Sequence, residues 1–323
     1  MTTLPAIAPV APAVAAAPTL SIVMLSWNTR ELLRACLASL FAPADEKGHG
    51  VDFEVIVVDN GSRDGSADLV AADFPLVTLK RNGVNEGYAR GNNQGAALAK
   101  GRFLLLLNSD TEVQPGALAL LVRFLENCPE YGGCAPKLVN PDGSVQRACM
   151  RFPTLAAGFL YDSWFERKFG RSRAVRDYFM EDFDHLGDAD VDQPPGACFL
   201  IRRELWQAIG GFDERLWLFF NDVELCRRVR DRGLKIRYLA RVAVLHHGGK
   251  STSQYRDFTG EWMVNRIRYY RMRHGAWGVF VLKTWLALRA LEEAAKVWKI
   301  ARGADLRAGM GAIQKVVKRA FAA

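Results

Sequence analysis

Residues 102–113 read RFLLLLNSDTEV, and their polarity indicates the class of fold. Five apolar residues, FLLLL, are followed at once by Asn108, Ser109 and Asp110. A continuous apolar run, in place of the alternation of a half-buried strand, predicts a strand that is buried on both faces. The three polar residues at the end of that strand either form an ordinary turn or bind a charged ligand.

Apolar runs alternate with helical patterns between residues 20 and 127, which predicts an α/β fold with a mostly parallel sheet flanked by helices. The helix expected over residues 30–41 carries Leu32, Leu33, Cys36 and Leu40 on one face. The other expected strands are LSIVMLS (20–26), FEVIVVD (53–59) and LVTLKR (76–81). Ligands of open sheets bind at the carboxyl ends of the strands, so the polar residues there are the candidates for function.

The second half of the chain is less regular. Residues 196–211 predict a strand, a helix and a Gly-Gly stop, and residues 221–233 predict a helix that ends at a glycine. Residues 235–247 predict one or two strands. Residues 150–192 are rich in aromatic and charged side chains, and we expect a loop or a lid over a site there.

Composition bounds the class of protein. A chain of 323 residues that is 50% hydrophobic buries a sizeable core, which excludes disorder throughout. Residues 1–18 are rich in Ala and Pro and have no basic start, so we expect a disordered tail and not a cleaved signal peptide. The six cysteines form no C-x-x-C pair, which argues against a zinc site or a disulfide framework and fits a reducing cytoplasm.

The net charge of +8 is concentrated at the C-terminal end. Residues 266–323 hold thirteen lysines and arginines and three acidic residues, a net charge of +10, so the remainder carries −2. Trp277 and Trp298 lie among these charges, as in a helix on an anionic membrane surface. Helices packed on the body with a solvated basic face are the alternative. Lys283 and Arg289 interrupt the best apolar stretch, which stays below the roughly 20 residues of a spanning helix.

Asp59 ends an expected strand, where its carboxylate could accept hydrogen bonds from a ribose hydroxyl or a base N–H. The turn dipeptides Asn60-Gly61 and Asp64-Gly65 favour an ordinary turn equally.

Glycines recur every four residues at Gly87, Gly91 and Gly95. On a helix this spacing clears one face, either for a ligand or for close packing on a neighbour. Neither G-x-x-x-x-G-K-[ST] nor G-x-G-x-x-G follows any expected strand, which weakens ATPase and nicotinamide-dehydrogenase interpretations.

Asp110 stands where a divalent cation that bridges two phosphates could be held, because Mg²⁺ and Mn²⁺ favour oxygen ligands. The alternative is a helix start before Pro115. His246 and His247 follow an apolar run, and either could complete a metal shell with Asp110 or be a buried structural histidine.

Asp222 lies in NDVE, residues 221–224, directly after the aromatic run LWLFF. Asn221 with Glu224 three residues later has the form of a capping box. Such a cap would fix the start of a helix and aim Asp222 as a general base at an acceptor hydroxyl.

Taken in order, seven segments resemble the family 2 glycosyltransferases of the GT-A fold, above all their rhamnosyltransferase branch. They span about residues 20–253. The segments are SIVMLSWNTRELLRACLASL, VIVVDNGSRDGS, NEGYARGNNQG, LLLLNSDTEV, RFPT, PPGACFLIRRELWQAIGGFDERLWLFFNDVELCRRVRDRG and VLHHGGKST. The resemblance implies a nucleotide-sugar donor, a divalent metal (Mg²⁺ or Mn²⁺) at the diphosphate, and transfer with inversion at the anomeric carbon.

The resemblance also assigns roles to residues. Asp222 would be the catalytic base, and Asp110 would hold the metal with His246 or His247. The acceptor side would be lined by Gly196, Ala197, Trp217 and Phe219. The nucleotide-sugar pocket would contain Ser26, Asn28, Asp59, Asn85, Gly87, Asn92, Asn108, Ser109 and Asp110.

Two positions depart from the family pattern. The metal motif is commonly D-x-D, and here its first acid is Asn108; the Glu-Asp pair of relatives is Asn221-Asp222. Both positions keep the second acid, and relatives in the rhamnosyltransferase branch carry such asparagines too, so the catalytic interpretation stands.

We therefore expect a cytoplasmic enzyme, peripheral at the inner face of the cell membrane, that moves L-rhamnose from dTDP-rhamnose to a cell-surface glycan or a lipid-linked acceptor. The alternatives are a UDP- or GDP-sugar donor and a non-catalytic sugar-nucleotide-binding protein; nucleic-acid binding is suggested by the net charge alone.

The expected organisation follows from the same segments. A tail covers residues 1–18, and a catalytic domain covers residues 19–255, with a nucleotide-sugar half to about residue 130 and an acceptor half after it. A basic, helical, membrane-associating region covers residues 256–323.

Overall fold

The computed structural model describes residues 17–41, 49–248 and 258–322 of the chain. Nearly all of the tail expected over residues 1–18, and the GKST end of the last family-like segment, lie outside the described residues.

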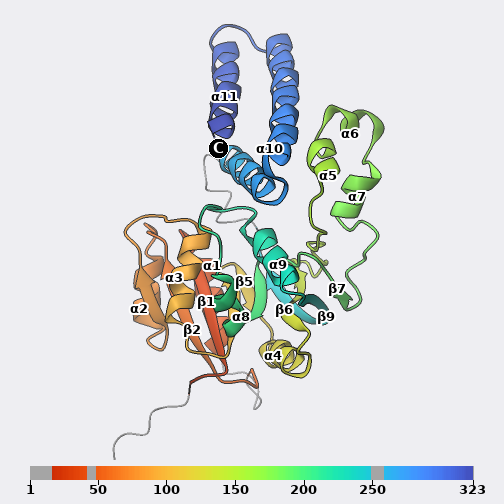
Figure 1. The fold of residues 1–323 in the computed structure, drawn as a ribbon. Coiled ribbons are helices and arrows are strands. Elements are labelled where there is room, and N and C mark those ends of the chain that lie inside the picture. The colour runs from red at the N-terminus through yellow and green to blue at the C-terminus, as the bar shows by residue number, and fades with distance from the viewer. Residues whose placement is uncertain (1–16, 42–48, 249–257, 323) are drawn as a thin grey trace, which may run out of the picture.

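The described residues form nine strands in one sheet and eleven helices around and beyond it (Figure 1). The strands are β1 (Leu20–Ser26), β2 (Phe53–Asp59), β3 (Thr78–Arg81), β4 (Phe103–Asn108), β5 (Thr111–Val113), β6 (Tyr131–Val139), β7 (Ala189–Asp190), β8 (Cys198–Arg202) and β9 (Lys235–His246). The helices are α1 (Arg30–Phe41), α2 (Ser66–Asp73), α3 (Tyr88–Leu98), α4 (Ala117–Asn127), α5 (Leu155–Leu160), α6 (Trp164–Phe169), α7 (Arg173–Tyr178), α8 (Arg203–Ile209), α9 (Asn221–Asp231), α10 (Phe258–Ile300) and α11 (Gly303–Ala322).

The sheet is mixed and mostly parallel, as the sequence predicts. Its order is β3-β2-β1-β4-β8-β6-β9-β5, and β7 pairs with β9. Strands β3, β2, β1 and β4 are mutually parallel, and β6 and β9 run the same way. Strands β8, β5 and β7 are antiparallel to their neighbours. The carboxyl ends of β1, β2, β4 and β9 therefore meet at one edge of the sheet.

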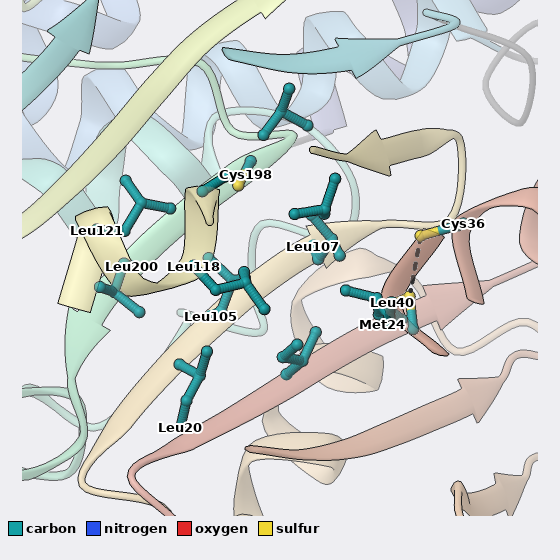
Figure 2. Packing of buried hydrophobic residues seen from close by; sticks show 14 of the residues in the cluster. Leu20, Met24, Cys36, Leu40, Leu105, Leu107, Leu118, Leu121, Cys198 and Leu200 are labelled. Atoms are coloured by element: carbon teal, nitrogen blue, oxygen red, sulfur yellow. Dashed lines mark hydrogen bonds between the residues drawn. The ribbon is translucent and has the colours of Figure 1, made fainter. Parts of the chain in front are cut away.

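Alternate residues of β4 pack into two different cores, which explains why its apolar run is continuous. Leu105 and Leu107 face α1 and α4, in the cluster that Figure 2 shows. There the Cys36 thiol donates a hydrogen bond to the sulfur of Met24 at 3.4 Å. Leu104 and Leu106 face the opposite core. A leucine fully buried in this way contributes about 1.5–3 kcal/mol to stability.

Helix α1 buries a slightly different face from the predicted one. Leu33, Cys36, Leu37 and Leu40 are buried, whereas Leu32 is only half-buried. The buried set has the i, i+3, i+4, i+7 spacing of one helical face, and Leu32 lies at the margin of that face.

Residues 150–192 were expected to be a loop or a lid over a site. The loop was wrong, because they form α5, α6, α7 and the short strand β7. Each of the three helices has a hydroxyl residue as its N-cap, Thr154, Ser163 and Ser172 respectively, and the hydroxyl oxygen accepts a hydrogen bond from a backbone N–H in the first turn, that of Ala157, Glu166 and Val175. The segment packs against α10, where the indole of Trp285 donates to the carbonyl of Tyr161 at 3.0 Å.

The C-terminal region is helical, as expected. Helix α10 breaks at Gly275 (φ 58°, ψ −146°), and α11 lies alongside its second part (Figure 1). No described helix combines the length and the apolar composition that crossing a bilayer requires.

Candidate active site

A cavity of about 420 Å³ opens at the carboxyl edge of the sheet, between the ends of β1, β4 and β9 and the starts of α3 and α9. It brings together eleven of the residues singled out from the sequence. They are Asn85, Gly87, Asn108, Ser109, Asp110, Gly196, Ala197, Trp217, Phe219, Asp222 and His246. Ser26, Asn28, Asp59, Asn92 and His247 do not line this cavity.

Asp110 follows β4 and is 5% exposed. The next residues form β5 and α4 begins only at Ala117, so the helix-start alternative for Asp110 is excluded. Oδ1 of Asp110 lies 3.4 Å from Nε2 of His246, at the end of β9. The two residues meet because β5 pairs antiparallel with β9, Thr111 opposite His246.

Gln146 fixes the orientation of the His246 ring. Its amide nitrogen donates to the His246 carbonyl at 2.8 Å, and its amide oxygen lies 2.8 Å from His246 Nδ1. An amide oxygen only accepts, so Nδ1 carries the proton. In the neutral ring Nε2 then has a free lone pair, and this lone pair faces the carboxylate of Asp110.

His247 lies elsewhere. Its Nε2 is 2.7 Å from Oε1 of Glu112, and its backbone N–H donates to the Asp110 carbonyl at 2.9 Å. Adjacent residues of an extended chain point to opposite sides, so only one histidine of the pair can face the cavity.

Asp222 lies in the first turn of α9 and faces Gly196, where an added Cβ would be 3.2 Å from Oδ2 of Asp222. Burial raises the pKa of the Asp222 carboxyl above its usual range. Gln193 donates to Oδ2 at 3.2 Å and the backbone N–H of Val223 donates to Oδ1 at 2.8 Å, and both hydrogen bonds oppose that rise. A buried carboxylate with a raised pKa is the form that a general base requires.

The predicted capping box is absent. Phe220 is the N-cap of α9, with φ 64°, and no side chain caps it. Asn221 lies inside the helix, and its Oδ1 accepts the N–H of Asp222 at 2.9 Å. Glu224 binds Arg228 and Arg273 through its carboxylate. The charged partners of Glu224 outcompete the backbone N–H that a capping box would use.

Tyr88, at the start of α3, contacts Asn108 and Gly196, which lie next to the two acidic residues Asp110 and Asp222. Its hydroxyl lies 3.4 Å from Oδ1 of Asn108 and 3.5 Å from the carbonyl of Gly196. Burial, together with the charges of Asp222 and Asp110, raises the pKa of Tyr88. The phenol therefore stays neutral and remains a hydrogen-bond donor between them.

The model of glycosyl transferase family 2 matches residues 21–207, more than half of the chain. This chain belongs to glycosyl transferase family 2. The resemblance recognised from the sequence is confirmed, and the residues from Asp222 onward, including His246, lie beyond the matched range.

Two relatives are similar to this family member over more than two thirds of its length. The N-acetylglucosaminyl-diphospho-decaprenol L-rhamnosyltransferase of Mycobacterium tuberculosis is 27% identical over 246 residues, 73% of this chain and 78% of that protein. The O-antigen biosynthesis protein RfbC of Myxococcus xanthus is 32% identical over 243 residues, 72% of this chain and 18% of that protein.

Solved structures share the GT-A fold. GalNAc-T7 with UDP, GalNAc and Mn²⁺ superposes with a TM-score of 0.55 at 18% identity, and covers 79% of this chain, which spans 48% of that protein. The mannosyltransferase PcManGT from Pyrobaculum calidifontis with GDP-Man and Mn²⁺ gives 0.52 at 17% identity over 95% of this chain and 87% of that protein. The mixed sheet flanked by helices is therefore a GT-A fold, as expected, with a helical C-terminal extension.

The residues at the end of β4 fit a divalent cation in this family member. The Asp110 carboxylate, an oxygen ligand of the kind that Mn²⁺ and Mg²⁺ favour, faces the Nε2 nitrogen of His246. Within the described ranges no three His, Cys, Asp or Glu side chains gather around one point. Donor phosphates and water would have to supply the remaining ligands.

Asp59 forms the ordinary turn, and its binding of a nucleoside stays a prediction. Its Oδ2 accepts the N–H of Ser62 at 3.0 Å, which is the turn. Its Oδ1 is buried and has no hydrogen-bond partner among the described residues. An orphaned buried carboxylate oxygen is costly, and a nucleoside N–H or hydroxyl would satisfy it.

Three other predicted residues act as scaffold in this structure. Ser26 lies 3.1 Å, Oγ to Oγ1, from Thr29, which in turn contacts Ser109. Asn28 accepts the N–H of Arg63 at 2.8 Å and so holds the loop after β2. Asn92 donates to the Tyr88 carbonyl inside α3.

The glycine spacing serves close packing. An added Cβ at Gly91 would lie 2.3 Å from Leu25, and one at Gly95 would lie 2.5 Å from Val23, so α3 sits directly on β1. Gly87 precedes the helix with φ 90°, and a Cβ there would lie 2.5 Å from the Trp217 ring.

Several functional candidates were missed from the sequence. Asn60 donates to Asn85 at 2.8 Å and accepts the N–H of Glu86 at 3.1 Å, which fixes the loop before α3. The sequence did carry a signal for Asn60, because Asn60 directly follows an expected strand. Gln146 and Gln193 had no such signal, because they act on residues far away along the chain.

Proposed function

We propose that this family 2 member is an inverting, metal-dependent glycosyltransferase that moves L-rhamnose from dTDP-rhamnose to a cell-surface glycan or a lipid-linked acceptor. One observation carries the proposal: the Asp222 carboxylate shares a single cavity with Asn108, Ser109 and Asp110. The cavity supports the proposal because Asp222 would act as the base on one side of the sugar, and Asp110 would hold a metal-bound diphosphate on the other.

The proposed reaction is a single displacement. Asp222 accepts the proton of an acceptor hydroxyl as its oxygen bonds to the anomeric carbon, and the bond from that carbon to the donor diphosphate breaks. Attack opposite the leaving group inverts the configuration. A divalent cation held by Asp110 and His246 would supply positive charge beside the leaving diphosphate. The Tyr88 hydroxyl, which contacts the Asn108 side chain at 3.4 Å, would hold Asn108 in place beside Asp110.

The choice of donor rests on the mycobacterial relative, which is named as an L-rhamnosyltransferase. UDP- and GDP-sugars are the competing donors, since the structural neighbours carry UDP and GDP-Man. A buried Asp59 oxygen without a partner is compatible with each nucleoside.

The proposed location is the cytoplasmic side of the cell membrane, with the chain bound peripherally. The second part of α10 carries an apolar stripe of five side chains, each more than half exposed: Trp277, Phe280, Leu288, Leu291 and Trp298. At 3.6 residues per turn these five positions fall within about 80° of one face. Residues 266–323, which contain this stripe, carry a net charge of +10, which suits an anionic bilayer surface.

Product analysis tests the proposal. The enzyme is incubated with Mn²⁺, a lipid-linked saccharide acceptor and one donor at a time, dTDP-rhamnose or a UDP- or GDP-sugar. Nucleoside diphosphate release is measured, and the anomeric configuration of the glycosylated acceptor is read by NMR. We expect release with dTDP-rhamnose and an inverted product. A retained configuration contradicts the mechanism, and donor binding without turnover supports the non-catalytic alternative.

A further inference from the structure

Arg266, in the first part of α10, is a buried cation that the proposed reaction does not use. Arg266 is 3% exposed, and no described acidic side chain forms an ion pair with its guanidinium. Nη2 donates to the carbonyl of Gly158, and Nη1 has no hydrogen-bond partner among the described residues. A buried charge without a counter-ion is destabilising, so its presence requires a reason.

Aromatic rings hold the guanidinium in place. It lies 4.6 Å from the ring centre of Trp285, 4.9 Å from that of Trp262 and 5.9 Å from that of Tyr161. Aromatic rings attract a cation, but they do not satisfy all five N–H donors of a guanidinium. The arginine is therefore pre-organised while part of its donor capacity is unused.

Arg266 lines a cavity of about 150 Å³. This is several times the volume of about 30 Å³ that one water molecule occupies in the liquid. Tyr161, Tyr178 and Tyr270 line the same cavity. Burial raises the pKa of Tyr270 to about 12, and it raises the pKa of Tyr178 as well, so both phenols are neutral donors at pH 7. The O–H of Tyr270 already donates to the Thr154 carbonyl at 3.0 Å, so the wall of the cavity offers one cation and the phenols of Tyr161 and Tyr178.

The position of this cavity relates it to the active site. Met150 and Phe220 line both the Arg266 cavity and the larger cavity that contains Asp222. Phe220 adopts φ 64°, an uncommon conformation for a bulky residue, directly before Asn221 and Asp222. Trp285, whose ring contacts the Arg266 guanidinium, lines an apolar crevice of about 290 Å³. The walls of that crevice include Phe159, Trp164, Phe165 and Leu288.

We propose that Arg266 binds a phosphate group of the acceptor, and that the acceptor is an amphiphile. Its sugar hydroxyl reaches Asp222, its phosphate lies at Arg266, and its apolar chain enters the crevice beside Trp285. The order of the three cavities matches the order of the three parts of such a molecule. This inference rests on the proposed function, since it assigns the acceptor of that reaction.

Equilibrium binding tests the inference without donor or turnover. Geranyl diphosphate, inorganic pyrophosphate and geraniol are titrated into the full chain by calorimetry in EDTA, which removes cations that would recruit diphosphates to Asp110. We expect geranyl diphosphate to bind at least tenfold more tightly than either of the other two. Equal affinity for geraniol and geranyl diphosphate in the unmodified protein overturns the phosphate site, and pyrophosphate that binds as tightly as geranyl diphosphate overturns the amphiphile.

Variants assign the binding to the residue. Arg266→Met, which keeps the apolar stem between the rings, should weaken geranyl diphosphate at least tenfold, and Arg266→Lys should lose less affinity because it keeps the charge. The matched control is Arg271→Met, an exposed arginine on the same helix, which should bind like the parent protein. Unchanged affinity in a folded Arg266→Met protein overturns the inference; if that variant does not fold, the comparison of ligands still decides.

The outcome is separable from the proposed function. Hydrolysis of a nucleotide-sugar by water reports the donor half alone, and the Arg266 variants should retain it. A protein that binds geranyl diphosphate through Arg266 but releases no nucleoside diphosphate refutes the transferase and not the phosphate site.

Discussion

The Nε2 nitrogen of His246 lies 3.4 Å from Oδ1 of Asp110, and the Nδ1–H of His246 points to Gln146. Gln146 thereby holds the free lone pair of the imidazole toward the carboxylate. Outer partners of this kind commonly change metal affinity by about 10–100-fold when they are removed.

The first prediction concerns Gln146. Gln146→Leu should weaken Mn²⁺ binding by about 10–100-fold, because the ring loses both its orientation and its fixed tautomer. Titration of Mn²⁺ followed by electron paramagnetic resonance measures this without donor or turnover. Gln207→Leu, at an exposed position, is the control and should bind Mn²⁺ like the parent protein. Equal affinities in the two variants would show that Gln146 plays no part.

The second prediction concerns Asp222. Asp222→Asn should lower turnover by about 10²–10⁴-fold, the usual contribution of a positioned base, with donor affinity preserved. Its melting temperature should be equal or higher, since a raised folded-state pKa means that the ionised carboxylate destabilises the fold at pH 7. Asp231→Asn at the other end of α9 is the control, and it should keep turnover. Normal turnover in the Asp222→Asn protein would show that Asp222 is not the catalytic base.

The third prediction is a pH profile. Asp222 works as a base only when ionised, and burial raises its pKa, so kcat/KM should fall on acidification at a pH above the ordinary aspartate value of about 3.9. The hydrogen bond from Gln193 lowers that pKa, so Gln193→Leu should move the acid limb to higher pH. Initial rates of the parent protein and of Gln193→Leu from pH 4 to 8 measure the acid limb of each. An acid limb that Gln193→Leu leaves in place would contradict the assignment.

The sequence was sufficient for the elements whose burial is continuous. The apolar runs of β1, β2 and β4 predicted a parallel sheet because each strand packs into a core on both faces. The same pattern placed Asn108, Ser109 and Asp110 at the ligand edge. Local polarity settles such features, since they depend on neighbouring residues alone.

Other features required the tertiary structure. Gln146 contacts a histidine one hundred positions away, and only the pairing of β5 with β9 selects His246 over His247. Glu224 has the capping-box spacing, but Arg228 and Arg273 bind it in the fold. Helices α5 to α7 were missed although Thr154, Ser163 and Ser172 carry the capping signal, because each helix is too short to show a periodic apolar face.

The fourth prediction concerns the apolar stripe of α10. Deleting residues 275–323 would also remove Leu282, Trp285 and Leu286, which are buried against the body, so surface substitutions are the sharper test. Trp277→Ser combined with Trp298→Ser should reduce binding to anionic vesicles at least tenfold and leave the melting temperature unchanged. Co-sedimentation with vesicles that contain phosphatidylglycerol measures this. Leu76→Ser, an exposed apolar residue remote from α10, is the control, and equal sedimentation of all three proteins would exclude the stripe as a membrane surface.

The fifth prediction concerns Asn108, where this chain departs from D-x-D. A second carboxylate beside Asp110 adds a charged oxygen ligand, so Asn108→Asp should preserve or tighten Mn²⁺ affinity. Calorimetric titration of Mn²⁺ into the two proteins checks this. Weaker binding in Asn108→Asp would show that the asparagine is itself required, for example as the partner of Tyr88.

The central claim is that Asp110 couples a divalent cation to a nucleotide-sugar donor. Thermal unfolding of the parent protein and of Asp110→Ala, with dTDP-, UDP- and GDP-sugars and with Mn²⁺ or EDTA, tests it most directly. One nucleotide class, dTDP on this account, should stabilise the parent protein in Mn²⁺ alone, and Asp110→Ala should show no such shift. Equal stabilisation of both proteins, or stabilisation that EDTA leaves intact, would contradict the account.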